Sequence, residues 1–300
     1  YKWGAFLDIR QLTYFISVVE NKSFSKAAKK LHLSQPSLSN AITKLEHNIG
    51  FPLLERSTRS VRLSDSGELF YQRATEILKK FQQFEIESAE IQQVGNKQLS
   101  IGIIESTKHW ISQVIRDYNK HQSITHYQLD EILSKDNVIN ALLNYKNHLV
   151  LTNQEITHQE LNVQKLYTEK LCLIANVNHA LFKIPNISLS DIQPYPFIIC
   201  SDGFETRNNI FKAFEAENLS LDVQFSVERF ETICELISND LGISILPERY
   251  CESINDSRLH FEYLDSSYFN RTVYLVTCKN RFVAPHVNLF IKHIFDFHNL

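Results

Sequence analysis

Hydrophobic residues in the first fifty positions recur with the spacing of amphipathic helices. Segments 12–19, 24–31 and 38–49 each place apolar side chains at i, i+3, i+4 and i+7, which is one face of a helix. Ser23 and Ser34 directly precede the second and third segments, and serine is a favoured N-cap. The pattern therefore predicts three short helices whose apolar faces close a small core.

The second and third helices are separated by only three residues, 32–34, and the small Ala27 and Ala28 allow the two helices to pack closely. This arrangement is typical of a helix-turn-helix. The third helix leaves a polar face of Gln35, Ser37, Ser39, Asn40, Thr43 and Lys44. Amide side chains can pair with adenine and lysine meets phosphate, so the face suits a major groove. The alternative is a solvated polar surface.

Within residues 51–63, two short β-type pieces surround the polar segment 57–60. This pattern predicts a hairpin with a basic tip, from which Arg56 and Arg59 would reach phosphates or a minor groove. Residues 8–63 hold nine Lys or Arg against four acidic residues. The chain as a whole carries −3, so the rest of it is acidic. A basic head (residues 8–63) followed by an acidic body is typical of a nucleic-acid-binding module joined to a sensor domain.

A long helix is predicted next, over residues 64–94. Its apolar residues step alternately by four and three, which is typical of a helix that pairs with a partner helix. The predicted dimerisation residues are Phe70, Ala74, Ile77, Phe81 and Phe84. The alternative is a helix packed on its own domain. A twofold dimer would present two reading helices to an interrupted dyad in double-stranded DNA.

Strand-like and helix-like runs alternate through residues 98–300, which predicts mainly parallel sheets flanked by helices. Ligands of such folds bind at the carboxyl ends of strands. Hydroxyl groups and helix N-termini at these ends suit a small anionic metabolite. The alternative for each residue alone is helix capping or loop solvation. The candidate effector-binding residues are Ser106, Thr107, Thr152, Asn153, Ser201, Phe204, Arg207 and Thr232.

The stretches SFSKAAKKLHLSQPSLSNAITKLE and PLLERSTRSVRLSDSGELF closely resemble the helix-turn-helix and wing of LysR-type transcriptional regulators. In the body, FIICSDGFETR and ETICELISNDLGISILP resemble the same family more loosely. Asn40 departs from the family, which often carries Arg there. The resemblance implies that DNA is contacted by Ser23, Lys26, Ser34, Gln35, Pro36, Ser37, Ser39, Asn40, Lys44, Arg56, Ser57 and Arg59.

The resemblance also implies an α/β fold with an N-terminal all-α winged helix-turn-helix. We expect that DNA-binding domain at 8–63, a dimerising linker helix at 64–94 and an effector-binding regulatory domain at 98–300. The regulatory domain would have two α/β subdomains, as in type II periplasmic binding proteins. Subdomain I would cover about 98–169 and 268–300, and subdomain II about 170–267. Oligomers of the family are dimers or tetramers.

Other classes of protein fit the sequence less well. The chain has no GxGxxG, GxxxxGK[ST], GxSxG or HExxH motif, so we expect no enzyme, cofactor or metal site. A solute-binding protein leaves the basic head unexplained, and a simple nucleoid protein leaves the body unexplained. Five scattered cysteines favour buried apolar roles over redox sensing. Residues 1–7 are too short for a signal peptide and no long apolar run exists, so we expect a cytoplasmic protein without a membrane span.

Overall fold

The computed structural model describes residues 7–55, 61–92 and 97–300. The chain forms two compact units, one ending at Ala89 and the other beginning at Glu90. None of the helices within the described residues has both the length and the apolar character needed to cross a membrane.

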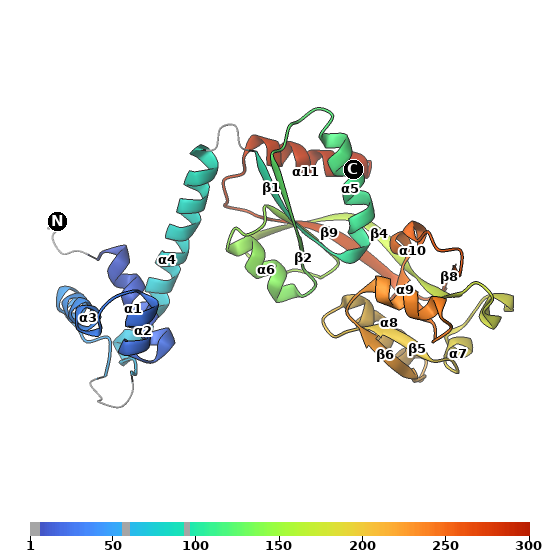
Figure 1. Ribbon diagram of the computed structural model, residues 1–300, viewed down its shortest axis with the longest axis horizontal. Helices are drawn as coiled ribbons and strands as arrows, with labels where there is room; N and C mark the ends of the chain where they lie inside the picture. Colours follow the sequence, from blue (N-terminus) through green and yellow to red (C-terminus); the bar gives the residue numbers. More distant parts are fainter. Residues whose placement is uncertain (1–6, 56–60, 93–96) are drawn as a thin grey trace. The chain divides into compact units, whose positions relative to one another are not determined.

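The first unit contains the three predicted helices (Figure 1). The predicted caps are confirmed, because Ser23 Oγ accepts a hydrogen bond from Lys26 N at 3.3 Å and Ser34 Oγ accepts one from Ser37 N at 3.2 Å. Phe15 lies at the centre of a core to which all three helices contribute. The helices are α1 (Ile9–Asn21), α2 (Phe24–Lys30) and α3 (Gln35–Ile49).

The predicted wing is observed at its base. Leu54 and Leu63 form an antiparallel bridge, and Glu55 N donates to Arg62 O at 2.9 Å. The tip, residues 56–60, lies outside the described residues. The expected contacts of Arg56, Ser57 and Arg59 therefore lie outside them too.

Helix α4 (Asp65–Gln92) follows the wing and packs its first turns on the head. Ala74 is buried in the head's own core, and the Phe70 ring lies 5.5 Å from that of Phe15 in an edge-on arrangement. These two residues of the predicted dimer seam are thus covered by their own chain, whereas Ile77, Phe81 and Phe84 are exposed.

The second unit is built on a sheet whose strand order is β2-β1-β3-β9-β4-β7, with β8 also paired to β4. Residues Leu161–Lys170 of β4 pair with β9, and Leu171–Ile174 pair with β7. Strands β4 and β9 run side by side at the join between two subdomains (Figure 1). The strands are β1 (Gln98–Ile103), β2 (His126–Glu131), β3 (Leu149–Thr152), β4 (Leu161–Asn176), β7 (Ser244–Pro247), β8 (Leu259–Tyr263) and β9 (Asn270–Cys278).

Each subdomain has its own hydrophobic core. Subdomain I packs α5 (Lys108–Tyr118), α6 (Lys135–Leu143) and α11 (Pro285–Phe297) against its strands. Subdomain II adds the parallel pair β5 and β6. Its elements are β5 (Phe197–Cys200), β6 (Val223–Val227), α7 (Leu189–Ile192), α8 (Glu205–Ala216), α9 (Phe230–Ser238) and α10 (Glu248–Ser253). Three short 3-10 turns complete the unit, η1 (Glu105–Thr107), η2 (Ala180–Lys183) and η3 (Ser267–Phe269).

The expectation of mainly parallel sheets is wrong. The β1–β2, β1–β3 and β5–β6 pairs are parallel, but all pairings made by β4 and β9 are antiparallel. The chain crosses between the subdomains on these two strands, and each runs opposite to its neighbours. The sequence pattern also missed β8 and residues 161–170 of β4, whose exposed polar residues weaken the apolar run. The exact domain limits stay a prediction.

Candidate nucleic-acid interface and ligand cleft

The outer face of α3 carries polar side chains held on a well-capped helix. The side chains are exposed because Leu38, Ile42 and Leu45 take up the inner face. A lysine at this surface adds positive charge that suits phosphate. The exposed residues of the predicted interface on this helix and its cap are Ser34, Gln35, Pro36, Ser37, Ser39, Asn40 and Lys44. On α2, Lys26 is also exposed and Ser23 is half-buried at the cap.

The base of the wing is fixed to α3 by one carboxylate. Glu46 Oε1 accepts hydrogen bonds from Leu53 N at 2.7 Å and from Leu54 N at 3.1 Å. A second contact joins the start of α4, where Ser64 Oγ donates to Pro52 O at 2.7 Å. Helix α3 and the wing base therefore form one rigid surface, as two-element contact with a duplex requires.

A buried ion pair lies where the two regulatory subdomains meet. Arg271 on β9 donates from Nε and Nη2 to Glu169 Oε1 on β4, at 2.9 and 2.6 Å. The same guanidinium donates to Ser106 Oγ of subdomain I at 2.6 Å and to Thr206 Oγ1 of subdomain II at 3.0 Å. Both charged side chains are almost fully buried. One arginine thus joins the two crossing strands to a hydroxyl from each subdomain.

Two cavities adjoin Arg271 of this pair. The smaller has a volume of about 10 Å³ and is lined by Glu105, Ser106, Phe204, Thr206 and Phe230, among others, which is room for about one water molecule. The larger has a volume of about 400 Å³ and a polar lining, within the size range of small-molecule sites. Its lining residues are Lys135, Asn153, Gln154, Glu155, Glu205, Asn209, Lys212, Asn270, Arg271, Thr272 and Tyr274.

Three of the eight candidate effector residues line these cavities, namely Ser106, Asn153 and Phe204. Others face inward. Thr107 Oγ1 donates to Ile104 O at 2.7 Å, and Thr152 Oγ1 accepts from Gln154 N at 3.1 Å.

The remaining three candidates stand apart from the lining of both cavities. Arg207 donates to Cys200 O at 3.0 Å and pairs with Asp202 at 3.0 Å. Ser201 is half-buried at the end of β5, and Thr232 is exposed on α9.

Glu105 is an acidic residue in the cleft wall that sequence reasoning missed. Its side chain is buried, and Oε1 accepts a hydrogen bond from Phe230 N at 2.8 Å. Burial and the nearby Glu231 carboxylate raise the pKa of Glu105 to about 8. Arg271, Thr206 and Phe230 were missed as well. The available signal was a charged residue directly after the apolar run of β1, and an arginine within the second crossing segment.

The cysteines fit the expected buried roles. All five are free, and four of them are buried. Burial raises the pKa of Cys200 and of Cys234 to about 12, which disfavours the reactive thiolate. Among the described residues, no group of three His, Cys, Asp or Glu side chains could hold a metal ion.

Family models match nearly the whole chain. Residues 9–68 match the bacterial regulatory helix-turn-helix protein of the lysR family, and residues 92–297 match the LysR substrate binding domain. The second match alone covers more than half of the 300 residues.

The chain is also similar to individual proteins along most of its length. The uncharacterized HTH-type transcriptional regulator YybE of Bacillus subtilis is 24% identical over 96% of this chain and 98% of its own length. The Hca operon transcriptional activator HcaR of Escherichia coli is 27% identical over 85% of this chain and 86% of its own length. The fold resembles that of full-length CbnR complexed with its target DNA, with a TM-score of 0.61 and 20% identity over 97% of this chain and 100% of that one.

Proposed function

The chain belongs to the LysR family of transcriptional regulators, and from this premise we propose how its own residues read DNA and bind an effector. As a member of the family it is a DNA-binding regulator with an effector-binding domain, and it forms oligomers. We propose which residues contact DNA, which class of effector binds and which surface forms the oligomer.

DNA reading is assigned to the exposed face of α3. Its support is that the polar side chains of Gln35, Asn40 and Lys44 are exposed and take no part in the head's core. Amide side chains can distinguish base edges in the major groove, and lysine neutralises phosphate. Arg56 and Arg59 of the wing are proposed to add phosphate contacts.

Selection of genomic fragments by the purified full chain tests this assignment. Footprinting of the selected fragments should show a protected, interrupted dyad in a promoter region. The test variant is the triple substitution Gln35→Ala, Asn40→Ala, Lys44→Ala, which should give no such footprint. Equal footprints from both proteins would overturn the assignment to α3.

The effector is proposed to be a small anion in the larger cavity. Lys135 and Lys212 line this cavity together with the acidic Glu155 and Glu205, and Lys135 begins α6. The two ammonium groups and the helix N-terminus are the groups that would bind an anion there. Arg271, by contrast, is already neutralised by Glu169. Calorimetry of the full chain against a panel of small mono-, di- and tricarboxylates is the test. Lys212→Gln should abolish the binding that Lys183→Gln, an exposed substitution on η2, leaves intact. Equal binding by both variants would contradict the site.

The regulator is proposed to act without catalysis and in the cytoplasm. The named relatives are transcriptional regulators, and chromosomal DNA is the target that its family membership implies. An assay of the purified chain for turnover of the bound effector tests the first point.

A further inference from the structure

Charged side chains beside the small cavity link the two regulatory subdomains. Glu105 belongs to subdomain I, and the Phe230 amide that it accepts from is the first residue of α9 in subdomain II. Arg229, the N-cap residue of α9, provides no side-chain cap. The cap of this helix is therefore supplied by a carboxyl group from the other subdomain, and it exists only while the subdomains touch.

Ion pairs surround this contact. Lys108 Nζ lies 3.3 Å from Glu131 Oε1 and 3.8 Å from Glu231 Oε1, so it joins a residue of its own subdomain to one of α9. Arg229 Nη1 lies 3.6 Å from Glu131 Oε2. These partly exposed pairs hold the surfaces together around the buried Glu105.

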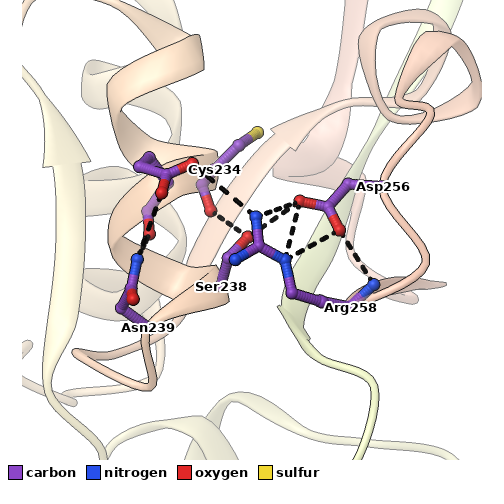
Figure 2. A network of polar contacts seen from close by, with 6 residues as sticks. Cys234, Ser238, Asn239, Asp256 and Arg258 are labelled. Atoms are coloured by element: carbon purple, nitrogen blue, oxygen red, sulfur yellow. Dashed lines mark hydrogen bonds and ion pairs between the residues drawn. The ribbon is translucent and has the colours of Figure 1, made fainter.

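Helix α9 is fixed to subdomain II at its opposite end (Figure 2). Ser238 Oγ donates to Cys234 O at 2.8 Å and to Asp256 Oδ2 at 3.2 Å. Arg258 binds the same Asp256 carboxylate at 2.7 Å and lies 3.7 Å from Glu235. Because of this network, α9 moves with subdomain II, and any separation of the subdomains must break the Glu105 contact.

The environment of the Glu105 carboxyl disfavours its negatively charged form. The residue is 2% exposed, and no N–H or O–H donor among the described residues reaches Oε2. An unpaired buried carboxylate oxygen is costly, whereas a protonated one can donate. The neighbouring acceptor is Glu231, whose pKa is lowered chiefly by its hydrogen bond with Glu105. The charged and titratable groups around Glu105 are Glu231 and Cys234 on α9, Lys108 on α5, Tyr250 on α10 and Arg271 on β9. Arg229, the N-cap residue of α9, and Glu131 on β2 belong to the surrounding ion pairs.

We propose that Glu105 is a proton-binding site that couples closure of the regulatory cleft to protonation. The carboxyl holds a proton on Oε2 while the subdomains are in contact, and it releases the proton to solvent when they separate. This inference stands on contacts within the regulatory domain, and it depends neither on the effector nor on the DNA site.

The sign of the pH dependence follows from linkage. While the two subdomains are in contact, burial and the Glu231 carboxylate raise the pKa of Glu105 to about 8. Once the subdomains separate and the group is exposed, its usual pKa of 4.5 applies. Protonation of Glu105 therefore stabilises the closed arrangement to its full extent below pH 4.5, the lower of the two pKa values. Between them, each pH unit lowers the closed-to-open ratio about tenfold, and above the higher value the ratio no longer changes.

Infrared spectroscopy of the full chain tests protonation directly. At pH 6 the wild type should show the carbonyl stretch of a protonated buried carboxyl, and the band should titrate away with a midpoint near 8. Glu105→Gln should lack the band, while Glu228→Gln, an exposed control two residues before Phe230, should keep it. Absence of the band in the wild type, or its persistence in Glu105→Gln, overturns the proposal.

Hydrogen exchange at the Phe230 amide tests the coupling to closure. After correction for the intrinsic pH dependence of exchange, wild-type protection should fall about tenfold per unit between pH 6 and pH 8. Glutamine retains an acceptor oxygen but cannot ionise, so protection in Glu105→Gln should not change with pH. Equal pH dependence in both proteins contradicts the coupling. Should that variant fail to fold, Glu231→Gln still decides, because removing the neighbouring charge must shift the infrared midpoint to lower pH, and an unchanged midpoint counts against the proposal.

Discussion

Ser25 on α2 donates a hydrogen bond of 3.0 Å to Gln35 Oε1 at the start of α3. The two helices of the helix-turn-helix are thus joined by a side-chain contact on the exposed face proposed to read DNA. The bond occupies the carbonyl oxygen of Gln35 and leaves its NH2 group to donate to acceptor atoms on a base.

Replacement of Gln35 should therefore reduce sequence discrimination. Gln35→Ala removes the base-edge contact, and we expect a loss of roughly tenfold or more in the ratio of specific to non-specific affinity. Ser25→Ala keeps the amide but frees its orientation, so its loss should be smaller. Fluorescence anisotropy with the selected site and a scrambled duplex measures both, with the exposed Gln164→Ala of β4 as control. Unchanged discrimination in Gln35→Ala would show that this side chain faces no base.

The charge of Lys44 should act in a different way. It is exposed on the same helix, and a phosphate contact carries no sequence information. Lys44→Gln should weaken specific and scrambled duplexes alike and reduce the salt slope of log affinity by about one. Lys183→Gln, far along the sequence in η2, should leave the slope unchanged. A slope that stays the same in Lys44→Gln would remove this residue from the interface.

Local features of this fold could be read from the sequence, and features that depend on distant partners could not. Ser23 and Ser34 were recognisable as caps because a cap is decided within four residues. The α4 seam was ambiguous, because the same spacing serves a partner helix and the chain's own core, and Ala74 turned out to lie in that core. Glu105 and Arg271 were missed because residues 125 and 102 positions away satisfy them, and periodicity carries no information about such partners.

The exposed half of that seam should still hold the oligomer. Ile77, Phe81 and Phe84 keep 48%, 37% and 63% of their surface exposed, and burying this remaining surface against a second copy is favourable by about 1–2 kcal/mol each. Phe84→Ser should therefore raise the dissociation constant at least tenfold in sedimentation experiments. Gln82→Ser, at an exposed polar position two residues before Phe84, is the matched control. Identical sedimentation of Phe84→Ser and wild type would exclude α4 as the interface.

Gly67 should be required for the junction between wing and α4. A Cβ atom at this position would lie 2.0 Å from the Leu53 carbonyl oxygen, and backbone cannot yield as a flexible side chain does. Gly67→Ala should destabilise the head by about 1–3 kcal/mol through overpacking. Loss of amide protection in α1–α3 is the measurement. Ser66→Ala, exposed and one residue earlier, should retain full protection, and equal protection in both variants would argue against this close approach.

The buried pair of Arg271 and Glu169 should show strong coupling between its members. Arg271→Met leaves the Glu169 carboxylate uncompensated in the interior, and removal of one partner of a buried pair costs about 3–5 kcal/mol. Glu169→Gln keeps an acceptor oxygen but removes the charge that neutralises the guanidinium, which is then left with neutral partners such as the Ser106 and Thr206 hydroxyls. The double variant buries no unpaired charge, so its loss of stability should be smaller than the sum of the two single losses. Urea unfolding followed at the regulatory domain gives the three values. Additive losses would mean that the two charges do not stabilise each other, and the assignment of this pair as the link between the crossing strands would fail.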